Sequence, residues 1–273
     1  MHMDLIIELI ENNVKQYEIG MEYYKNNDSK AVEWFKKSAS QGNTKAKVRL
    51  GDCYYFGELI ERDYMQAVNL YQEASEEGDE MALLNLGDCL RMGHGIQKDL
   101  EAAFKIFEKL ANHDNIHAKV RLGECYALGE GIEQDYEQAV RWHQEASREG
   151  NEAAKLWLGW YLQTGNGVKR SDEVAFAIYR NLSMKGNIEA KYKLAECYQQ
   201  GCGTIINLDK AICLFKQSGE NGHAPAQNSL GELYLEGMGV KKDKQEAIKW
   251  FKLAVAQGDE EAQKNLERCS RFI

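Results

Sequence analysis

The apolar and small residues of this chain recur with a period of 36 residues. Three columns repeat without a gap: a leucine, the small residue after it, and an alanine four positions earlier. The leucine column contains Leu50, Leu86, Leu122, Leu158, Leu194, Leu230 and Leu266. The other two contain Gly51, Gly87, Gly123, Gly159, Ala195 and Gly231, and Ala46, Ala82, Ala118, Ala154, Ala190, Ala226 and Ala262. A fixed period of about 20–50 residues indicates a repeat architecture, in which each repeat is one supersecondary element.

Each repeat is predicted to contain two helices, A and B. Helix A begins after a residue that can accept hydrogen bonds from the unpaired N–H groups of a first turn. These cap positions are Asn43, Asp79, Asn115, Asn151, Asn187, His223 and Asp259. The residues before them suit the left-handed conformation that ends a preceding helix: Gly42, Gly78, Asp114, Gly150, Gly186, Gly222 and Gly258. Helix A ends at another glycine column: Gly57, Gly93, Gly129, Gly165, Gly201 and Gly237.

The turn from helix A to helix B has the pattern Gly-x-Gly-Ile/Val, for example in residues 93–96 and 237–240. Its two glycines permit positive φ angles. Helix B then begins at a good N-cap residue: Asp63, Asp99, Asp135, Ser171, Asn207 or Asp243. Its apolar residues, such as Ala67, Tyr71 and Ala74, are spaced to share one buried face.

This pattern resembles the Sel-one-like repeat (SLR) family, a longer-turned relative of the tetratricopeptide repeat. Residues 226–251 carry it nearly complete, as Ala-x-x-x-Leu-Gly-x-x-Tyr-x-x-Gly-x-Gly-Val followed by Asp-x-x-x-Ala-x-x-Trp-Phe. The resemblance covers roughly residues 44–269. It implies a scaffold or adaptor that binds a peptide or protein in a concave groove, because the family is associated with complex assembly, signalling and bacterial interactions with hosts or rivals.

We expect an all-α fold, an α/α right-handed superhelical solenoid of helix-turn-helix repeats with about fourteen helices and no sheet. Residues 1–43 should form a capping helix and an abbreviated tetratricopeptide-like repeat, in which Gly20 and Ala31 are closer together than Gly51 and Ala67. Six 36-residue repeats should fill residues 44–259, and residues 260–273 a capping half-repeat. Glu267 replaces the column glycine in that half-repeat, as expected where no further helix packs.

Charge and composition narrow the expected partners to proteins. The net charge is −9, and the 34 Lys and Arg residues are scattered, so we expect no nucleic-acid partner. The compact basic cluster Lys241, Lys242 and Lys244 is interpreted as solvated charge in a turn. The apolar run of residues 5–7 is too short for a signal sequence or a membrane span. We therefore expect a cytoplasmic, monomeric protein that does not bind membranes.

The seven cysteines are interpreted as packing residues with two exceptions. Five lie in one repeat column, two residues after the column of Gly51: Cys53, Cys89, Cys125, Cys197 and Cys269. Packed helices lie about 8–10 Å apart, whereas a disulfide needs Cα atoms within about 7 Å, so these cysteines should remain small buried thiols. Cys202 and Cys213 lie outside the column, and Cys213 takes a position where other repeats have polar residues.

Candidate chemistry is weak elsewhere. His113, Asp114 and His117 resemble a metal cluster, but no other repeat has histidines at the matching places. The Gly-x-Gly turns are not followed by the Lys-Ser/Thr that grips phosphate. No nucleophile–base pair can be nominated. We therefore expect no metal, cofactor or catalytic residue. The resemblance leaves one catalytic alternative, a hydrolase of the type proposed for some cysteine-rich members of the resembled family.

The candidate binding surface is the face of helix A that carries the columns of Arg49 and Asp52. Most repeats have a basic and an acidic residue there, three apart, which can pair along the helix. One repeat has Trp157 and Trp160 instead. Exposed aromatic residues ringed by polar groups are typical of binding hot spots. The predicted partner-binding set is Trp157, Trp160, Arg121, Glu124, Tyr192, Lys193 and Glu196.

Two alternatives remain open at this stage. The two tryptophans could fill a local gap in the core, because large apolar residues are usually buried. The partner could also be a single cognate toxin or enzyme, which would make the chain an immunity or regulatory protein.

Overall fold

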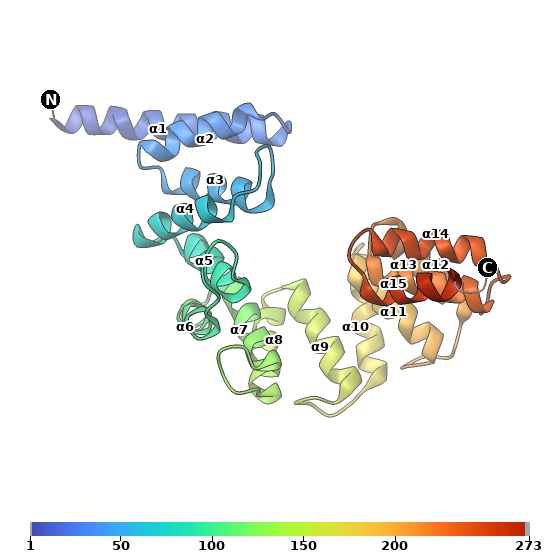
Figure 1. Ribbon diagram of the computed structural model, residues 1–273. Coiled ribbons are helices and arrows are strands. Elements are labelled where there is room, and N and C mark those ends of the chain that lie inside the picture. Colours follow the sequence, from blue (N-terminus) through green and yellow to red (C-terminus); the bar gives the residue numbers. More distant parts are fainter. Residues whose placement is uncertain (1, 271–273) are drawn as a thin grey trace. The chain divides into compact units, whose positions relative to one another are not determined.

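The computed structural model describes the backbone of residues 2–270 and the side chains of residues 12–269. This part of the chain contains fifteen helices and no strand, which confirms the predicted all-α solenoid and adds one helix to the number expected (Figure 1). The chain divides into two compact units, residues 1–142 and 143–273, which we call unit 1 and unit 2 and describe separately.

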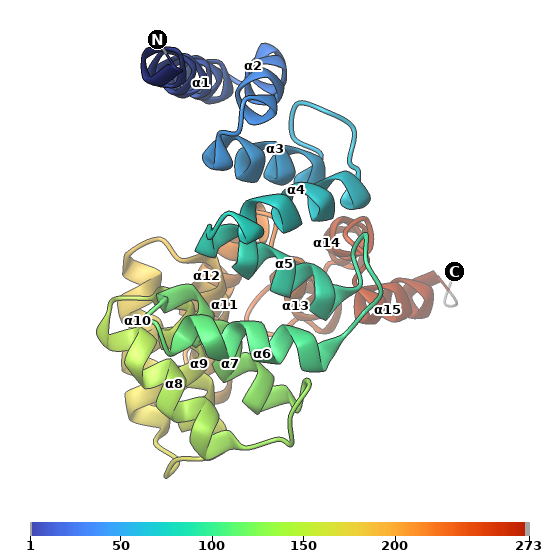
Figure 2. The same cartoon turned by 90° about the vertical axis from the view of Figure 1, so that its left-hand side faces the viewer.

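Unit 1 is a stack of helices that pack in chain order (Figure 2). The helices of unit 1 are α1 (His2–Lys25), α2 (Lys30–Ser40), α3 (Thr44–Phe56), α4 (Tyr64–Glu76), α5 (Glu80–Met92), α6 (Leu100–Ala111) and α7 (Ile116–Leu128). The division between the units falls within α8 (Tyr136–Arg148). From α3 onward, odd-numbered helices are A helices and even-numbered helices are B helices.

Unit 2 repeats the same arrangement. It contains α9 (Glu152–Thr164), α10 (Asp172–Met184), α11 (Ile188–Gln200), α12 (Leu208–Glu220), α13 (Ala224–Glu236), α14 (Lys244–Val255) and α15 (Glu260–Ser270). Consecutive helices from α9 to α15 pack against each other. The A helices α11 and α13 therefore each lie between two B helices along the chain.

The helix boundaries follow from the predicted caps. Asn43 accepts a hydrogen bond from the backbone N–H of Ala46, and the ring of His223 does the same for Ala226. All seven residues that precede these caps have positive φ, including the one non-glycine among them, Asp114 (φ 63°). The A helices then end at left-handed glycines such as Gly57 (φ 72°).

The glycine after the leucine column allows the two helices of a repeat to approach closely. A Cβ atom added to Gly51 would lie 2.6 Å from the Tyr71 ring, and one added to Gly231 would lie 2.4 Å from the Phe251 ring. Real Cβ atoms do not approach ring carbons so closely, so an aromatic side chain of helix B fills the space that glycine leaves. This contact lies at the centre of the packing in repeats such as those of Gly51, Gly159 and Gly231.

The second glycine of the A–B turn allows the turn to pack closely against the preceding repeat. A Cβ atom added to Gly131 would lie 2.1 Å from the backbone oxygen of Leu100, at the start of the preceding B helix. Gly203 has the same relation to the backbone oxygen of Asp172. The turn thus packs directly against backbone, and no side chain fits there.

The cysteines lie where the repeat pattern predicted. The five column cysteines are buried, Cys202 is partly buried and Cys213 is exposed, and all seven are free thiols. Burial raises the pKa of Cys53 to about 11 and that of Cys89 to about 12. The thiols of Cys53 and Cys89 are therefore protonated and poor nucleophiles at neutral pH.

Candidate partner-binding surface

The A helices carry rows of charged residues that pair both along a helix and between neighbouring A helices. In unit 1, the Arg121 guanidinium donates two hydrogen bonds to Asp88 on α5, at 2.8 and 3.2 Å. The same group lies 3.4 Å from Glu124 on its own helix. The predicted pairing of Arg121 with Glu124 is confirmed, and the link to Asp88 ties α7 to α5.

Arg91 extends this network toward the A–B turn. Its guanidinium donates to Glu124 at 2.9 Å and to Glu130 at 3.4 Å. The side chains of Arg91 and Glu124 are each 13% exposed. Such a half-buried network fixes the positions of both arginines, because their charges are matched by nearby carboxylates.

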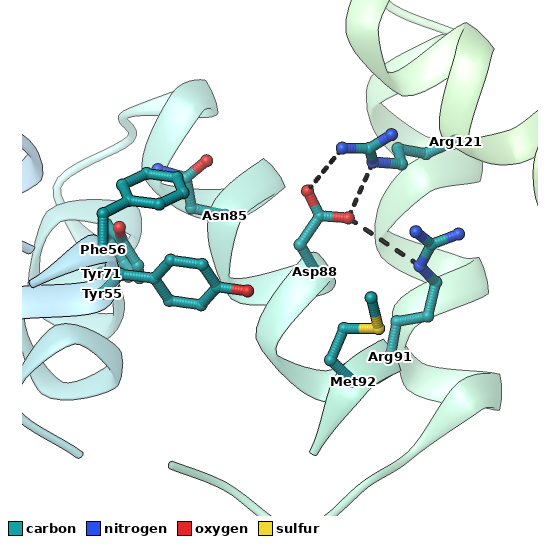
Figure 3. A pocket seen from close by; sticks show the side chains of 8 residues that line it. All are labelled: Tyr55, Phe56, Tyr71, Asn85, Asp88, Arg91, Met92 and Arg121. Atoms are coloured by element: carbon teal, nitrogen blue, oxygen red, sulfur yellow. Dashed lines mark hydrogen bonds and ion pairs between the residues drawn. The ribbon is translucent and has the colours of Figure 1, made fainter. Parts of the chain in front are cut away.

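A pocket of about 190 Å³ opens beside this network, between α3, α5 and α7. It is lined by Tyr55, Phe56, Tyr71, Asn85, Asp88, Arg91, Met92 and Arg121. Figure 3 shows the aromatic side chains on one side of the pocket and the ion-paired Asp88, Arg91 and Arg121 on the other. Small-molecule sites usually have about 300–1,000 Å³, so the pocket is sized for a single side chain of a larger partner.

The polar floor of the pocket is organised by Asp52. This carboxylate accepts hydrogen bonds from the Tyr71 hydroxyl at 2.9 Å and from the Asn85 amide at 3.1 Å. Burial raises the pKa of Asp52 and also that of Tyr71. Both groups are thus held in place by their own contacts, and the Asn85 side chain is fixed with them.

A second hollow of about 390 Å³ adjoins the pocket, since Phe56 and Asn85 line both. Its other lining residues include Arg49, Asp52 and Met81. Met81 is 43% exposed. The two hollows thus adjoin along α3 and α5, and both are lined by apolar and charged groups.

The two predicted tryptophans of unit 2 belong to an aromatic cluster. Trp157 stacks on the ring of the fully buried His143, with 5.4 Å between centroids. Trp160 meets Trp157 edge-on at 5.7 Å and Tyr161 at 5.3 Å. Neither tryptophan is fully buried or fully exposed. One side of the pair therefore packs on the core.

The remaining predicted residues of unit 2 form a compact group on α11. Lys193 pairs with Glu196 at 2.9 Å, as expected. The Tyr192 hydroxyl donates to the same carboxylate at 2.9 Å, and the Lys193 ammonium lies 4.9 Å from the Tyr192 ring centroid. The structure thus brings together Tyr192 with its neighbours, Trp157 with Trp160, and Arg121 with Glu124. A joint ring around the tryptophans stays a prediction.

Sequence reasoning missed the pocket of unit 1. Its apolar rim contains Phe56 and Met92, which are 56% and 55% exposed. The signal was a further repeat column, which is apolar at Phe56, Met92 and Leu128 and polar at Thr164, Gln200 and Glu236. The binding hypothesis rests on the two columns that contain the tryptophans.

The residues that resemble a metal cluster have other roles. The ring of His113 hydrogen-bonds the backbone oxygen of Lys109, and Asp114 pairs with Lys119 at 2.8 Å. Among the described side chains, no three His, Cys, Asp or Glu residues are grouped to hold a metal ion. None of the helices in residues 2–270 combines the length and apolar character needed to cross a membrane.

Paired helices with capped A helices and glycine-ended turns define an α-solenoid repeat protein. The family model for the Sel1 repeat matches seven segments: residues 16–43, 44–79, 80–115, 116–151, 153–187, 188–223 and 224–259. The chain therefore belongs to the Sel1 repeat family, as its sequence pattern indicated. Residues 16–43, expected to be tetratricopeptide-like, match this model as well.

Solved structures agree with this assignment. A protective antigen of uropathogenic Escherichia coli with an SLR fold is 30% identical, with a TM-score of 0.65, and the match covers 96% of this chain but 58% of that one. A Sel1 repeat protein from Oxalobacter formigenes is 29% identical over 88% of this chain and 96% of that one, with a TM-score of 0.74.

A more distant likeness shows the fold alone. An immunity protein from Pseudomonas aeruginosa is 20% identical, with a TM-score of 0.56, and the match covers 80% of this chain and 83% of that one. No curated protein matched the chain.

Proposed function

We propose that the chain is a non-catalytic scaffold that binds a protein segment along the face of its A helices. The observation that carries this proposal is the pocket between α3, α5 and α7, where exposed apolar side chains adjoin fixed, ion-paired arginines. Such a combination suits a protein partner, because apolar anchors supply affinity and fixed polar groups supply orientation. Its small volume favours a partner's side chain over a small-molecule substrate.

The aromatic cluster of unit 2 is proposed as a second contact region. Trp157 and Trp160 take positions where other repeats have polar or charged residues, and both retain exposed surface. Tyr192, Lys193 and Glu196 are held together on the next A helix. Tryptophan contributes strongly to protein interfaces when a partner covers it.

The test begins with affinity purification from the native cell and identification of bound proteins by mass spectrometry. The purified partner is then titrated against the wild type, the double variant Trp157→Ala/Trp160→Ala, and Met92→Ser. We expect both variants to weaken binding per folded molecule by at least about tenfold. Leu253→Ser, which changes a half-exposed leucine of a B helix, is the control and should bind normally.

The outcomes separate the two contact regions. If the tryptophan variant unfolds early and binds normally per folded molecule, the tryptophans are core residues. If Met92→Ser also binds normally, the A-helix face is not the binding surface. A toxin or enzyme as the partner would support the narrower hypothesis of an immunity or regulatory protein. Light scattering of the purified chain tests the proposed monomeric state.

A further inference from the structure

The A–B turns of unit 1 carry a strong excess of negative charge. The three turns with the starts of their B helices, residues 57–66, 93–102 and 129–138, contain nine acidic residues and two basic ones, Arg62 and Lys98. The acidic residues are Glu58, Glu61, Asp63, Asp99, Glu101, Glu130, Glu133, Asp135 and Glu137. The matching segments of unit 2, residues 165–174, 201–210 and 237–246, contain five acidic and six basic residues. The excess is therefore not a requirement of the turn.

Part of this charge has no structural use. Three of the aspartates cap their B helices by accepting hydrogen bonds from backbone N–H groups of the first turn: Asp63, Asp99 and Asp135. Glu101 pairs with Lys105 at 2.6 Å. Glu61, Glu133 and Glu137 are exposed, and the described side chains offer them no ion pair. These three carboxylates remain available to a partner.

An apolar stripe runs beside the acidic turns. Phe56, Met92 and Leu128 are the last residues of α3, α5 and α7, and they are 56%, 55% and 54% exposed. Each directly precedes the glycine that begins an A–B turn. Three exposed large apolar side chains at equivalent places form a surface that a partner can cover.

We propose that this surface of unit 1 binds a basic amphipathic helix of a protein partner. The inference rests on the proposed function and names the chemistry of the partner. Lysines and arginines of the partner would face the acidic turns, and its apolar side chains would cover the stripe. A nucleic acid or an anionic lipid surface would be repelled by the same carboxylates.

The spacing of the stripe favours a helix. Neighbouring packed helices lie about 8–10 Å apart, and side chains of successive A helices contact each other, as Arg121 and Asp88 do. Apolar side chains of the partner should therefore recur at about 10 Å. An α-helix rises about 1.5 Å per residue, so seven residues span about 10 Å. An apolar side chain at every seventh position of the partner helix would therefore match the stripe.

The experiment uses the full chain and a fluorescein-labelled synthetic helix of about 20 residues. The probe has leucine at every seventh position and a second leucine one helical turn after each of these. Its other positions are lysine and alanine. One control peptide replaces each lysine with glutamate, and another replaces each leucine with serine. Fluorescence anisotropy at low and at physiological salt gives each dissociation constant.

Two sets of variants test the surface itself. Glu61→Gln/Glu133→Gln/Glu137→Gln removes the three available charges, and Met92→Ser/Leu128→Ser removes two apolar side chains. The matched controls in unit 2 are Asp209→Asn/Glu260→Gln/Glu267→Gln, which changes three exposed acids, and Leu253→Ser. We expect each unit 1 variant to raise the dissociation constant of the lysine probe at least about tenfold. The controls should leave that constant unchanged.

Equal binding of the lysine and glutamate peptides, no binding of the lysine peptide, or equal effects of unit 1 and unit 2 variants would each refute a basic partner. The proposed function fails separately, through the natural partner. If that partner loses affinity with Met92→Ser but not with the triple glutamine variant, the A-helix scaffold stands and the basic helix falls.

Discussion

At the residue scale, His143 and Tyr161 both depart from the residue type usual in their repeat columns, and the two departures compensate each other. The column of His143 has a large aromatic ring in other repeats, such as Tyr179, and the column of Tyr161 has a small residue, such as Cys197. Tyr161 is fully buried, and its hydroxyl lies 3.0 Å from Nδ1 of His143. A buried polar pair of this kind is stable only because each partner satisfies the other.

Removing the Tyr161 hydroxyl should therefore destabilise the protein. Tyr161→Phe is expected to lower the free energy of unfolding by about 1–3 kcal/mol, because the buried ring nitrogen loses this hydrogen bond. Tyr179→Phe is the matched control, since the Tyr179 hydroxyl is buried without a hydrogen-bond partner in the described residues. It should be neutral or stabilising in urea unfolding. Equal losses in both variants would contradict the pairing.

A second prediction at the residue scale is that the stabilisation by Glu189 depends on pH. The hydrogen bond with His223 (2.7 Å) lowers the pKa of Glu189 below its ordinary value of 4.5. Nδ1 of His223 accepts the N–H of Ala226, so Nε2 carries the proton and donates to Glu189. Because the folded-state pKa is depressed, the stabilisation is present above pH 4.5 and is lost as the pH falls through the folded-state value.

The measurement compares the wild type with Glu189→Gln in urea unfolding between pH 6.5 and 3.5. The wild type should be more stable by up to about 1 kcal/mol at pH 6.5, a small effect because Glu189 is half-exposed. The difference should shrink toward pH 3.5. Glu260→Gln, which changes an exposed acid, should show no such trend. A difference that grows on acidification would reverse the assigned sign.

At the scale of the element, the two helices of a repeat depend on one glycine. Gly51→Ala places a methyl group 2.6 Å from the Tyr71 ring, so α3 and α4 must separate. Overpacking of this kind should cost about 1–3 kcal/mol in the free energy of unfolding. Gly219→Ala is the control, because its nearest neighbours are 3.2–3.3 Å away and include flexible side-chain ends. It should change stability by less than about 1 kcal/mol.

The helices could be predicted from sequence because each boundary has a local cause. Caps such as Asn43 and glycines such as Gly57 act on adjacent backbone groups, and a period of 36 residues repeats the signal. The site depends on contacts between repeats instead. Whether Trp157 is exposed depends on His143, which no local pattern places beneath it. The pocket likewise depends on side chains from three A helices, including Phe56 on α3 and Arg121 on α7.

At the scale of the whole molecule, charge is distributed unequally between the two units. Residues 1–142 contain 26 Asp and Glu against 16 Lys and Arg, whereas residues 143–273 contain 17 against 18. The net charge of −9 thus arises in unit 1. Like charges within a compact unit repel each other and lower its stability.

Added salt should therefore stabilise unit 1 more than unit 2. Hydrogen exchange followed by mass spectrometry is the measurement, because it resolves peptides of each unit. Raising the ionic strength from about 0.01 to 0.15 M shortens the screening length from about 30 to 8 Å. We expect slower exchange in residues 12–142 and little change in residues 143–269. An equal response in both units would show that repulsion within unit 1 is negligible.

The turn glycines that pack on backbone also constrain how this chain can change in evolution. Gly131 and Gly203 each lie against a carbonyl at the start of the preceding B helix. An insertion of a few residues between them would move one turn away from its carbonyl and disturb every later repeat. Duplication or deletion of 36 residues restores the same contact at both junctions. Lineages of such proteins should therefore differ in length by whole repeats, while point substitutions accumulate on the A-helix faces.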